Sequence, residues 1–217
     1  MEEENVEEII EEEKEPWYKG PIKYIIVLFL LLLIVIWYFP VESIKLDPEP
    51  SRIPTIEEVL PPDFKLENET IEIKQNSDFY SYIKPYDPTI KQIANKIATI
   101  SCDGNQLCQA KAVYYFVRDN IEYVADPLGF EYVESPKEAL DIKSSDCEGG
   151  AILLASLLGA IGLDYELVFI PSHVFLRIKL DKALKRYKIG DWVYLDWTCK
   201  GCKFGEVPLE DKRYIDS

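Results

Sequence analysis

The longest uncharged stretch of the chain runs from Tyr24 to Val41 and reads YIIVLFLLLLIVIWYFPV. A helix rises about 1.5 Å per residue, so roughly 20 residues of this kind would cross the hydrocarbon core of a bilayer. The run has no polar face, which a surface helix of a globular domain would normally show. A cleaved signal peptide would have a shorter apolar run behind a basic leader, whereas this leader is rich in Glu. The sequence therefore predicts an uncleaved single-pass transmembrane helix over residues 21–41.

The expected orientation follows from the residues around this run. Lys residues are slightly more numerous before it than Lys and Arg residues shortly after it, which favours a cytoplasmic N-terminus. Asn68 opens an Asn-Glu-Thr glycosylation sequon, and four of the five Cys residues form close pairs that suit an oxidising compartment. We therefore expect a membrane protein whose C-terminal domain lies outside the cytoplasm, with glycosylation at Asn68.

Charge excludes one class of partner. The 217 residues include 24 Lys and Arg against 39 Asp and Glu, a formal net charge of −15. Nine Glu and one Lys fall within residues 1–15, so residues 1–20 form an acidic N-terminal tail. A nucleic-acid groove needs clustered cations that this chain does not supply. The membrane is the expected partner of the apolar run, and no nucleic acid is expected.

A proline-rich linker over residues 42–62 is expected to separate the apolar run from a domain at residues 63–217. Partial alternation over residues 64–76 favours a strand or a short hairpin, and residues 121–145 read as irregular. Helices are expected from Pro88 to about Ile100, from Gln106 to Asn120, and from Cys147 onward, where the pattern is apolar nearly all round. Strands are expected at residues 165–171, 173–180 and 192–198. Helices followed by strands indicate an α+β fold.

Three residues offer a chemical constellation. Cys147 opens the apolar helix, where free backbone N–H groups and the helix dipole favour a thiolate. His173 is the single His of the chain and hence the single candidate base, and Asp196 is a candidate to orient it. Asp146 and Glu148 flank the Cys and disfavour a thiolate unless His173 is protonated beside it. Each residue taken alone also has a purely structural interpretation.

The order of these residues resembles the transglutaminase-like superfamily, whose fold is papain-like. The resemblance rests on the segments SSDCEGGAILLASLLGAIGLDYELVFI, SHVFLRI and WVYLDWT, with FVRDNIEYV and SPKEALDIKSSDC upstream. It covers residues 88–200, the expected domain core, and implies a central Cys-bearing helix packed on an antiparallel sheet. It also implies that Cys147 is the nucleophile, His173 the base and Asp196 the orienting acid of a catalytic triad.

The sequence departs from the family pattern in places. Phe175 stands two residues after the His, where Trp is common, and Trp197 replaces the usual Pro after the closing Asp. Gly149 and Gly150 follow where a bulkier or acidic residue is frequent. The Cys147 backbone N–H and the Tyr123 side chain are the expected oxyanion donors.

The other four cysteines leave two interpretations open. Cys102 with Cys108, and Cys199 with Cys202, form two local disulfides or converge as a four-cysteine zinc site. The extracytoplasmic orientation favours disulfides, so no metal and no cofactor are expected.

The resemblance implies a membrane-anchored thiol enzyme, a cysteine protease, amidase or acyltransferase, acting on peptide or protein amides through a Cys thioester. Water as acceptor makes it a hydrolase, and an amine makes it a cross-linking enzyme. The alternative function is a catalytically inactive transglutaminase-like module that binds or scaffolds at the membrane surface. A structural zinc protein is a third interpretation, in which Cys147 is incidental.

Overall fold

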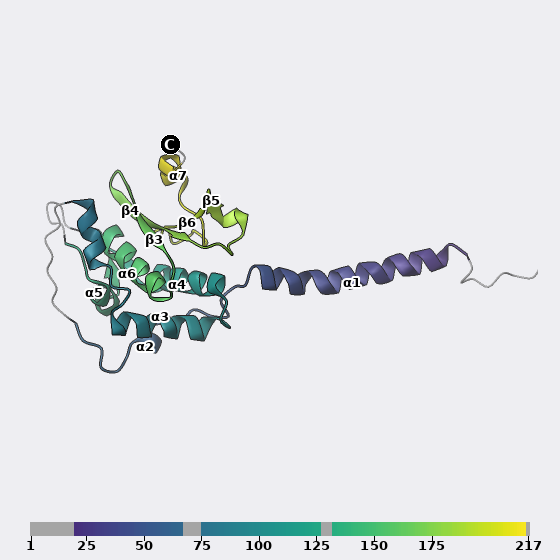
Figure 1. Ribbon diagram of the computed structural model, residues 1–217, viewed down its shortest axis with the longest axis horizontal. Coiled ribbons are helices and arrows are strands. Elements are labelled where there is room, and N and C mark those ends of the chain that lie inside the picture. Colours follow the sequence, from purple (N-terminus) through teal and green to yellow (C-terminus); the bar gives the residue numbers. More distant parts are fainter. Residues whose placement is uncertain (1–19, 67–74, 127–131, 216–217) are drawn as a thin grey trace, which may run out of the picture. The chain divides into compact units, whose positions relative to one another are not determined.

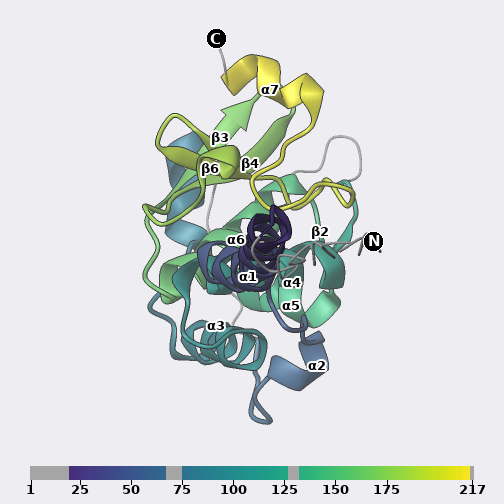
Figure 2. The same cartoon turned by 90° about the vertical axis from the view of Figure 1, so that its right-hand side faces the viewer.

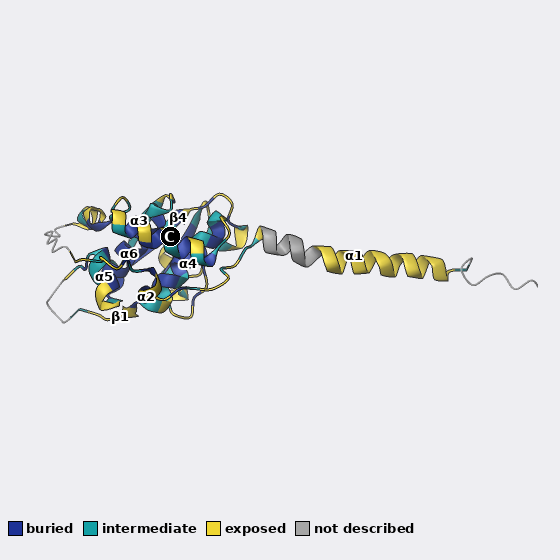
Figure 3. Cartoon of the chain, turned by 90° about the horizontal axis from the view of Figure 1, so that it is seen from below, coloured by how far each residue is buried: buried dark blue, intermediate teal, exposed yellow. Residues whose placement is uncertain are grey.

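The computed structural model describes residues 20–66, 75–126 and 132–215, with the backbone alone at residues 39–45. The chain forms two compact units, Met1–Lys45 and Leu46–Ser217. The first contains the long helix α1, Ile22–Leu46. Its described side chains are exposed along the helix (Figure 3).

The predicted transmembrane helix over residues 21–41 is contradicted. Helix α1 covers this range from Ile22 onward. Crossing a bilayer takes about 20 consecutive apolar residues. Among the residues that the structure describes, no helix is both long and apolar enough for that. The single-pass localisation and the membrane as partner are corrected with it, and the placement of the domain outside the cytoplasm loses the anchor on which it rested.

The second unit contains the remaining helices and strands (Figure 1). Its helices are α2 Ile56–Val59, η2 Asn76–Tyr82, α3 Pro88–Ser101, α4 Gln106–Asn120, α5 Pro136–Ile142, α6 Cys147–Ala160, η3 Lys185–Tyr187 and α7 Leu209–Ile215. Its strands are β1 Glu122–Tyr123, β2 Ser144–Ser145, β3 Tyr165–Ile170, β4 His173–Lys179, β5 Lys188–Ile189 and β6 Trp192–Leu195. Mixed helices and sheet make the fold α+β, as predicted.

Local sequence explains where the main helices begin. The side chains of Asp87, Asn105 and Asp146 each accept backbone N–H groups of the first turn of α3, α4 and α6. These side chains replace the hydrogen bonds that the first N–H groups of a helix lack. In α3, Pro88 occupies the first position, where its missing N–H costs nothing. The three helices therefore begin where the sequence predicts.

Helix α6 is the centre of the core. Nearly all its residues from Cys147 to Leu158 are buried, and it packs against α3, α4 and α5 and against β3 and β4. Strands β3, β4, β6 and β5 follow one another in an antiparallel sheet. Figures 1 and 2 place this sheet between α6 on one side and α7 on the other. The apolar character of α6 on all sides fits this central position.

Three segments differ from the expectations. Residues 121–145 are not irregular throughout, because α5 lies there and β1 pairs with β2 in a short parallel ladder. Strand β6 ends at Leu195 rather than 198, because Thr198 turns back to bond Asp196. The strand or hairpin expected at 64–76 falls largely on residues 67–74, outside the described residues.

Candidate functional site

The candidate nucleophile lies at the first turn of the central helix. Cys147 is 7% exposed, and the preceding Asp146 accepts the Gly149 backbone N–H at 3.0 Å. Just upstream, Ser145 of β2 donates to the buried Glu134 carboxylate at 2.9 Å. A Cβ on Gly149 would lie 2.3 Å from both Glu134 Oε2 and Ser145 Oγ. The glycine therefore allows a buried polar pair to pack against the start of α6.

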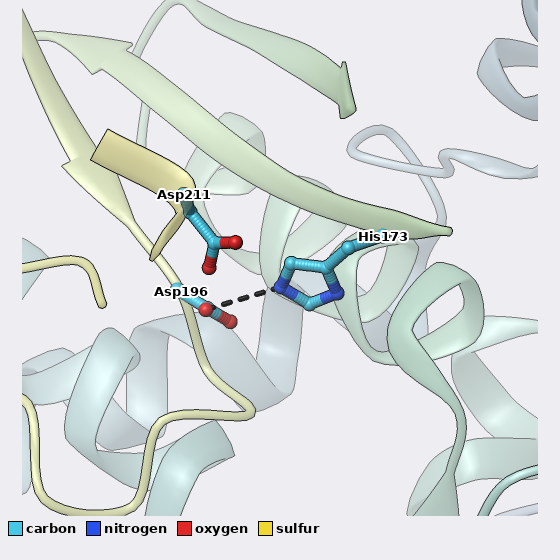
Figure 4. A group of neighbouring side chains, drawn as sticks. All are labelled: His173, Asp196 and Asp211. Carbon is cyan, nitrogen blue, oxygen red and sulfur yellow. Dashed lines mark hydrogen bonds and ion pairs between the residues drawn. The ribbon is translucent and has the colours of Figure 1, made fainter. Parts of the chain in front are cut away.

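The candidate base and acid face each other across neighbouring strands. Strand β4 begins at His173, and Asp196 follows the last residue of β6, its antiparallel neighbour. His173 Nε2 lies 3.1 Å from Asp196 Oδ2 (Figure 4). The other ring nitrogen, Nδ1, points away from Asp196. Antiparallel pairing therefore brings together two residues that are 23 positions apart in sequence.

Asp196 is held on several sides. Its Oδ1 accepts the Thr198 backbone N–H at 3.0 Å and the Thr198 hydroxyl at 2.8 Å. The hydroxyl of Tyr114, on α4, donates to the Asp196 carbonyl at 3.1 Å. The Asp196 side chain is 1% exposed. With Oδ1 occupied, Oδ2 is left to face His173, which fixes the plane of the imidazole.

The Cys147 thiol bonds to its neighbour in sequence. Its Sγ donates to Glu148 Oε2 at 2.8 Å. Burial raises the pKa of the thiol to about 12, with further contributions from the hydrogen bond and the charge of Glu148. The backbone N–H of Val174 bonds the sulfur and acts in the opposite direction. In this arrangement the thiol is protonated, because burial and Glu148 outweigh the helix dipole on which the thiolate expectation rested.

His173 carries the opposite tendency. Burial alone would lower its pKa, but the hydrogen bond and the charge of Asp196 outweigh burial and raise it. The charges of Asp211 and Glu148 act in the same direction. The imidazole is thus surrounded by groups that favour its protonated form.

Tyr123, the expected oxyanion donor, lies beside the strand that leads into the nucleophile. It is on β1, paired with Ser145 of β2, two residues before Cys147. Burial raises the pKa of Tyr123, followed by the charge of Cys147. Its ring lies 6.2 Å from that of Trp197, and the residue is 46% exposed. Tyr123 therefore lies within electrostatic reach of the thiol, in an open position.

The two departures around Trp197 and Gly150 belong to one contact. Trp197 is fully buried, and its Nε1 donates to the Cys147 carbonyl at 3.4 Å. A Cβ on Gly150 would lie 2.1 Å from Trp197 Cε2, well inside van der Waals contact. The glycine makes room for the indole ring, so the ring packs directly on the backbone that presents the nucleophile.

The paired cysteines lie at two positions of the second unit. Disulfides join Cys102 to Cys108, between α3 and α4, and Cys199 to Cys202, just after Asp196. Cys147 is a free thiol. The predicted glycosylation residue, Asn68, lies outside the described residues.

Sequence reasoning missed three contacts at this site. The sequence marks Glu148 as a like charge beside Cys147, whereas the structure makes it the hydrogen-bond partner of the thiol. Thr198 belongs to the motif WVYLDWT, and its spacing from Asp196 is that of a local side-chain turn, which was a usable signal. Asp211, on α7, offers a carboxylate within 4.8 Å of the ligand atoms of His173 and Asp196, and nothing in its local sequence announces this.

Comparison with known proteins gives one match. No curated protein and no solved structure matches this chain significantly. Residues 91–196 match the family model of the Transglutaminase-like superfamily. The matched span begins in α3 and ends at Asp196, so it encloses Cys147 and His173. Over this span the chain is therefore similar to the Transglutaminase-like superfamily.

Proposed function

We propose that this domain is a thiol enzyme that transfers or hydrolyses the acyl group of peptide or protein amides. The observation that carries the proposal is the bond from His173 Nε2 to Asp196 Oδ2 at 3.1 Å, on an Asp fixed by Thr198. The Val174 N–H at the Cys147 sulfur supports it, because Val174 is the residue next to the base. The matched family span agrees with it.

The proposed chemistry uses the two ring nitrogens differently. With its Nε2–H donated to Asp196, the neutral imidazole offers Nδ1 as the acceptor for the Cys147 proton. The thiolate then attacks the amide carbonyl, and the amine leaves with a proton from the imidazolium, which yields a thioester. Water or a second amine attacks the thioester and releases the thiol. The Cys147 backbone N–H, and Tyr123 from the side, are the proposed donors to the developing oxyanion.

Glu148 defines what must move. While Sγ donates to Glu148 at 2.8 Å, its proton is committed to that carboxylate rather than to imidazole. Catalysis by this route requires the Cys147 or Glu148 side chain to change rotamer when an amide binds.

The hydrogen bond from Cys147 to Glu148 also favours a second candidate function, a transglutaminase-like module that binds proteins without catalysis. A thiol whose pKa is raised to about 12 is a poor nucleophile near neutral pH. In that case the bond between His173 and Asp196 serves only to hold the segment after β6 to the start of β4.

The two functions are separated by labelling the full chain with a peptide vinyl sulfone, an electrophile that takes the place of the scissile amide and adds a thiolate by conjugate addition. The enzyme proposal predicts rapid labelling of Cys147 that falls at least about a hundredfold in His173→Gln, because general-base activation is worth that much. Asp191→Asn, a charge removal in an exposed turn before β6, is the control and should label as the parent does. Equal labelling of the parent and His173→Gln rejects the enzyme and leaves the binding module.

A further inference from the structure

The third acidic residue at the site comes from a separate element. Helix α7, Leu209–Ile215, lies on the side of the sheet away from α6 in both ribbon views. From it the Asp211 carboxylate points toward His173 and Asp196 (Figure 4). One ligand atom from each of the three residues lies within 4.8 Å of the others. Three separate segments therefore converge on one point through a nitrogen and two carboxylates.

Within the described part of the chain, the Asp211 carboxylate accepts no hydrogen bond and forms no salt bridge. Among the described residues, Asp211 makes a hydrogen bond only through its backbone, where its N–H donates to the Pro208 carbonyl. Burial raises its pKa, the charge of His173 lowers it, and the charges of Asp196 and Glu210 raise it. Two carboxylates thus share one imidazole. Thr198 donates to Asp196, but when the imidazole is neutral no positive charge of the described residues lies between the two carboxylates in this cluster.

We propose that His173 Nε2, Asp196 and Asp211 bind a divalent transition-metal ion, with Zn²⁺ as the best-suited ion. One imidazole nitrogen and two carboxylate oxygens are an accepted ligand set for zinc, and water completes the coordination. Mg²⁺ and Ca²⁺ prefer oxygen ligands alone, so the nitrogen disfavours them.

The geometry requires a small closure. Zinc holds its nitrogen and oxygen ligands at about 2.0–2.2 Å, which places neighbouring ligand atoms of a tetrahedron about 3.4 Å apart. A pair of ligand atoms at the 4.8 Å limit must therefore approach by about 1.4 Å. Asp211 is partly exposed and lies on a helix of only seven residues, so its side chain can supply that movement.

Metal binding would act on the same nitrogen that the proposed catalysis uses. An ion on Nε2 displaces the Nε2 proton from its bond to Asp196 Oδ2, and in the neutral ring that proton then resides on Nδ1. A protonated Nδ1 accepts nothing from Cys147. The ion is therefore an inhibitor of the proposed reaction. This consequence rests on the proposed function, whereas the binding of the ion does not.

The binding test uses the full chain in a Cys147→Ser background, so that a free thiol contributes no ligand. Because the chain has one His, its two imidazole proton resonances are assigned without ambiguity. Zn²⁺ should shift both in proportion to the occupied fraction. Calorimetry on Asp211→Asn should show Zn²⁺ affinity at least about tenfold weaker than on Glu210→Gln. The latter removes one charge from the same helix and retains all three ligands. Any Zn²⁺ bound by the acidic N-terminal residues is the same in both variants, so it does not affect the comparison.

Imidazole resonances unchanged at saturating Zn²⁺ would overturn the proposal, and so would equal affinity of the two variants. Bound Co²⁺ should be displaced by Zn²⁺ and not by Mg²⁺, and displacement by Mg²⁺ at equal concentration would overturn the choice of a transition metal. The resonance shift is measured without a change at Asp211, so it decides the matter even if Asp211→Asn does not fold. Vinyl sulfone labelling of the chain with Cys147 present forms a separate arm. If Zn²⁺ binds as proposed but labelling does not depend on His173, the proposed enzyme function is rejected and the metal site stands.

Discussion

The Cys147 thiol donates a hydrogen bond to Glu148 Oε2 at 2.8 Å, so the two side chains that open α6 are bonded to each other. The helix dipole and the free N–H groups of a first turn favour a thiolate there. Burial and the neighbouring carboxylate oppose it and prevail. The resting nucleophile is therefore held as a thiol by the residue next to it.

Replacing Glu148 with Gln should make Cys147 more reactive. The substitution removes a negative charge and a hydrogen bond that both raise the thiol pKa, so the thiolate fraction increases. Each pKa unit is a factor of ten in that fraction. We expect iodoacetamide to alkylate Cys147 roughly tenfold faster in Glu148→Gln than in the parent near pH 7.5. Mass spectrometry measures the rate. Glu210→Gln is the control for charge removal, and an unchanged rate in Glu148→Gln would contradict the inferred restraint.

Asp196→Asn should impair the labelling reaction without unfolding the domain. An amide at this position can present its NH₂ group to Nε2 and leave the imidazole in the wrong tautomer. Loss of the orienting acid costs about 10²–10⁴ in rate in enzymes of this design. The rate constant for vinyl sulfone labelling should fall by a factor in that range, with the far-ultraviolet dichroism unchanged. A rate within a factor of two of the parent would remove Asp196 from the proposed machinery.

Stability should depend on pH through His173. Its folded pKa is raised above the unfolded value of about 6.5. The contribution to the free energy of unfolding is therefore complete below about pH 6.5 and disappears as the pH rises through the folded pKa. The stability lost in His173→Gln should be larger near pH 5.5 than near pH 9, measured by urea unfolding. Since the chain has one His, the difference between the two curves isolates this group, and a flat difference would contradict the prediction.

Gly150→Ala should destabilise the domain although alanine is the better helix former. The added Cβ would lie 2.1 Å from the buried Trp197 ring, and overpacking of this kind costs about 1–3 kcal/mol. Gly201→Ala is the matched control, because a Cβ there meets no atom within 4 Å. Urea unfolding should show a lower midpoint in the first variant alone. Equal midpoints would mean that the indole moves aside at little cost.

Removing the Cys102–Cys108 disulfide should lower the free energy of unfolding by about 2 kcal/mol, as the closure of a loop this short implies. Urea unfolding of the Cys102→Ser, Cys108→Ser double variant should show this loss. Adding a reductant should lower the stability of this variant less than that of the parent. Denatured parent alkylated without reductant should carry one label, on Cys147. Labels on all five cysteines would contradict both disulfides.

Much of the α+β core could be predicted because its signals are local. Caps such as Asp87 and Asn105 lie beside the helices they begin. The apolar pattern after Cys147 predicts a buried helix, and alternation predicts β3 and β4. The ladder of β1 and β2 has two residues a side and no period to detect, so residues 121–145 read as irregular.

The candidate site was predictable in part for the same reason. The family resemblance marks Cys147, His173 and Asp196, and the matched span encloses all three. Side-chain direction is a property of the folded chain, so the bond from Cys147 to Glu148 could not be read from their adjacency. Asp211 reaches the site because α7 folds back onto the sheet, which no spacing in the sequence encodes. The apolar run at residues 21–41 shows the converse, a strong local signal whose interpretation the described helix does not support.

The contact between Gly150 and the Trp197 ring also restricts the order in which this sequence can change. Alanine at 150 destabilises the domain while the indole fills the space that its methyl group needs. A smaller residue at 197 first leaves a cavity, and a side chain at 150 can then fill it. The less costly order away from this arrangement therefore changes position 197 before position 150, and the less costly order toward it gains the glycine before the tryptophan.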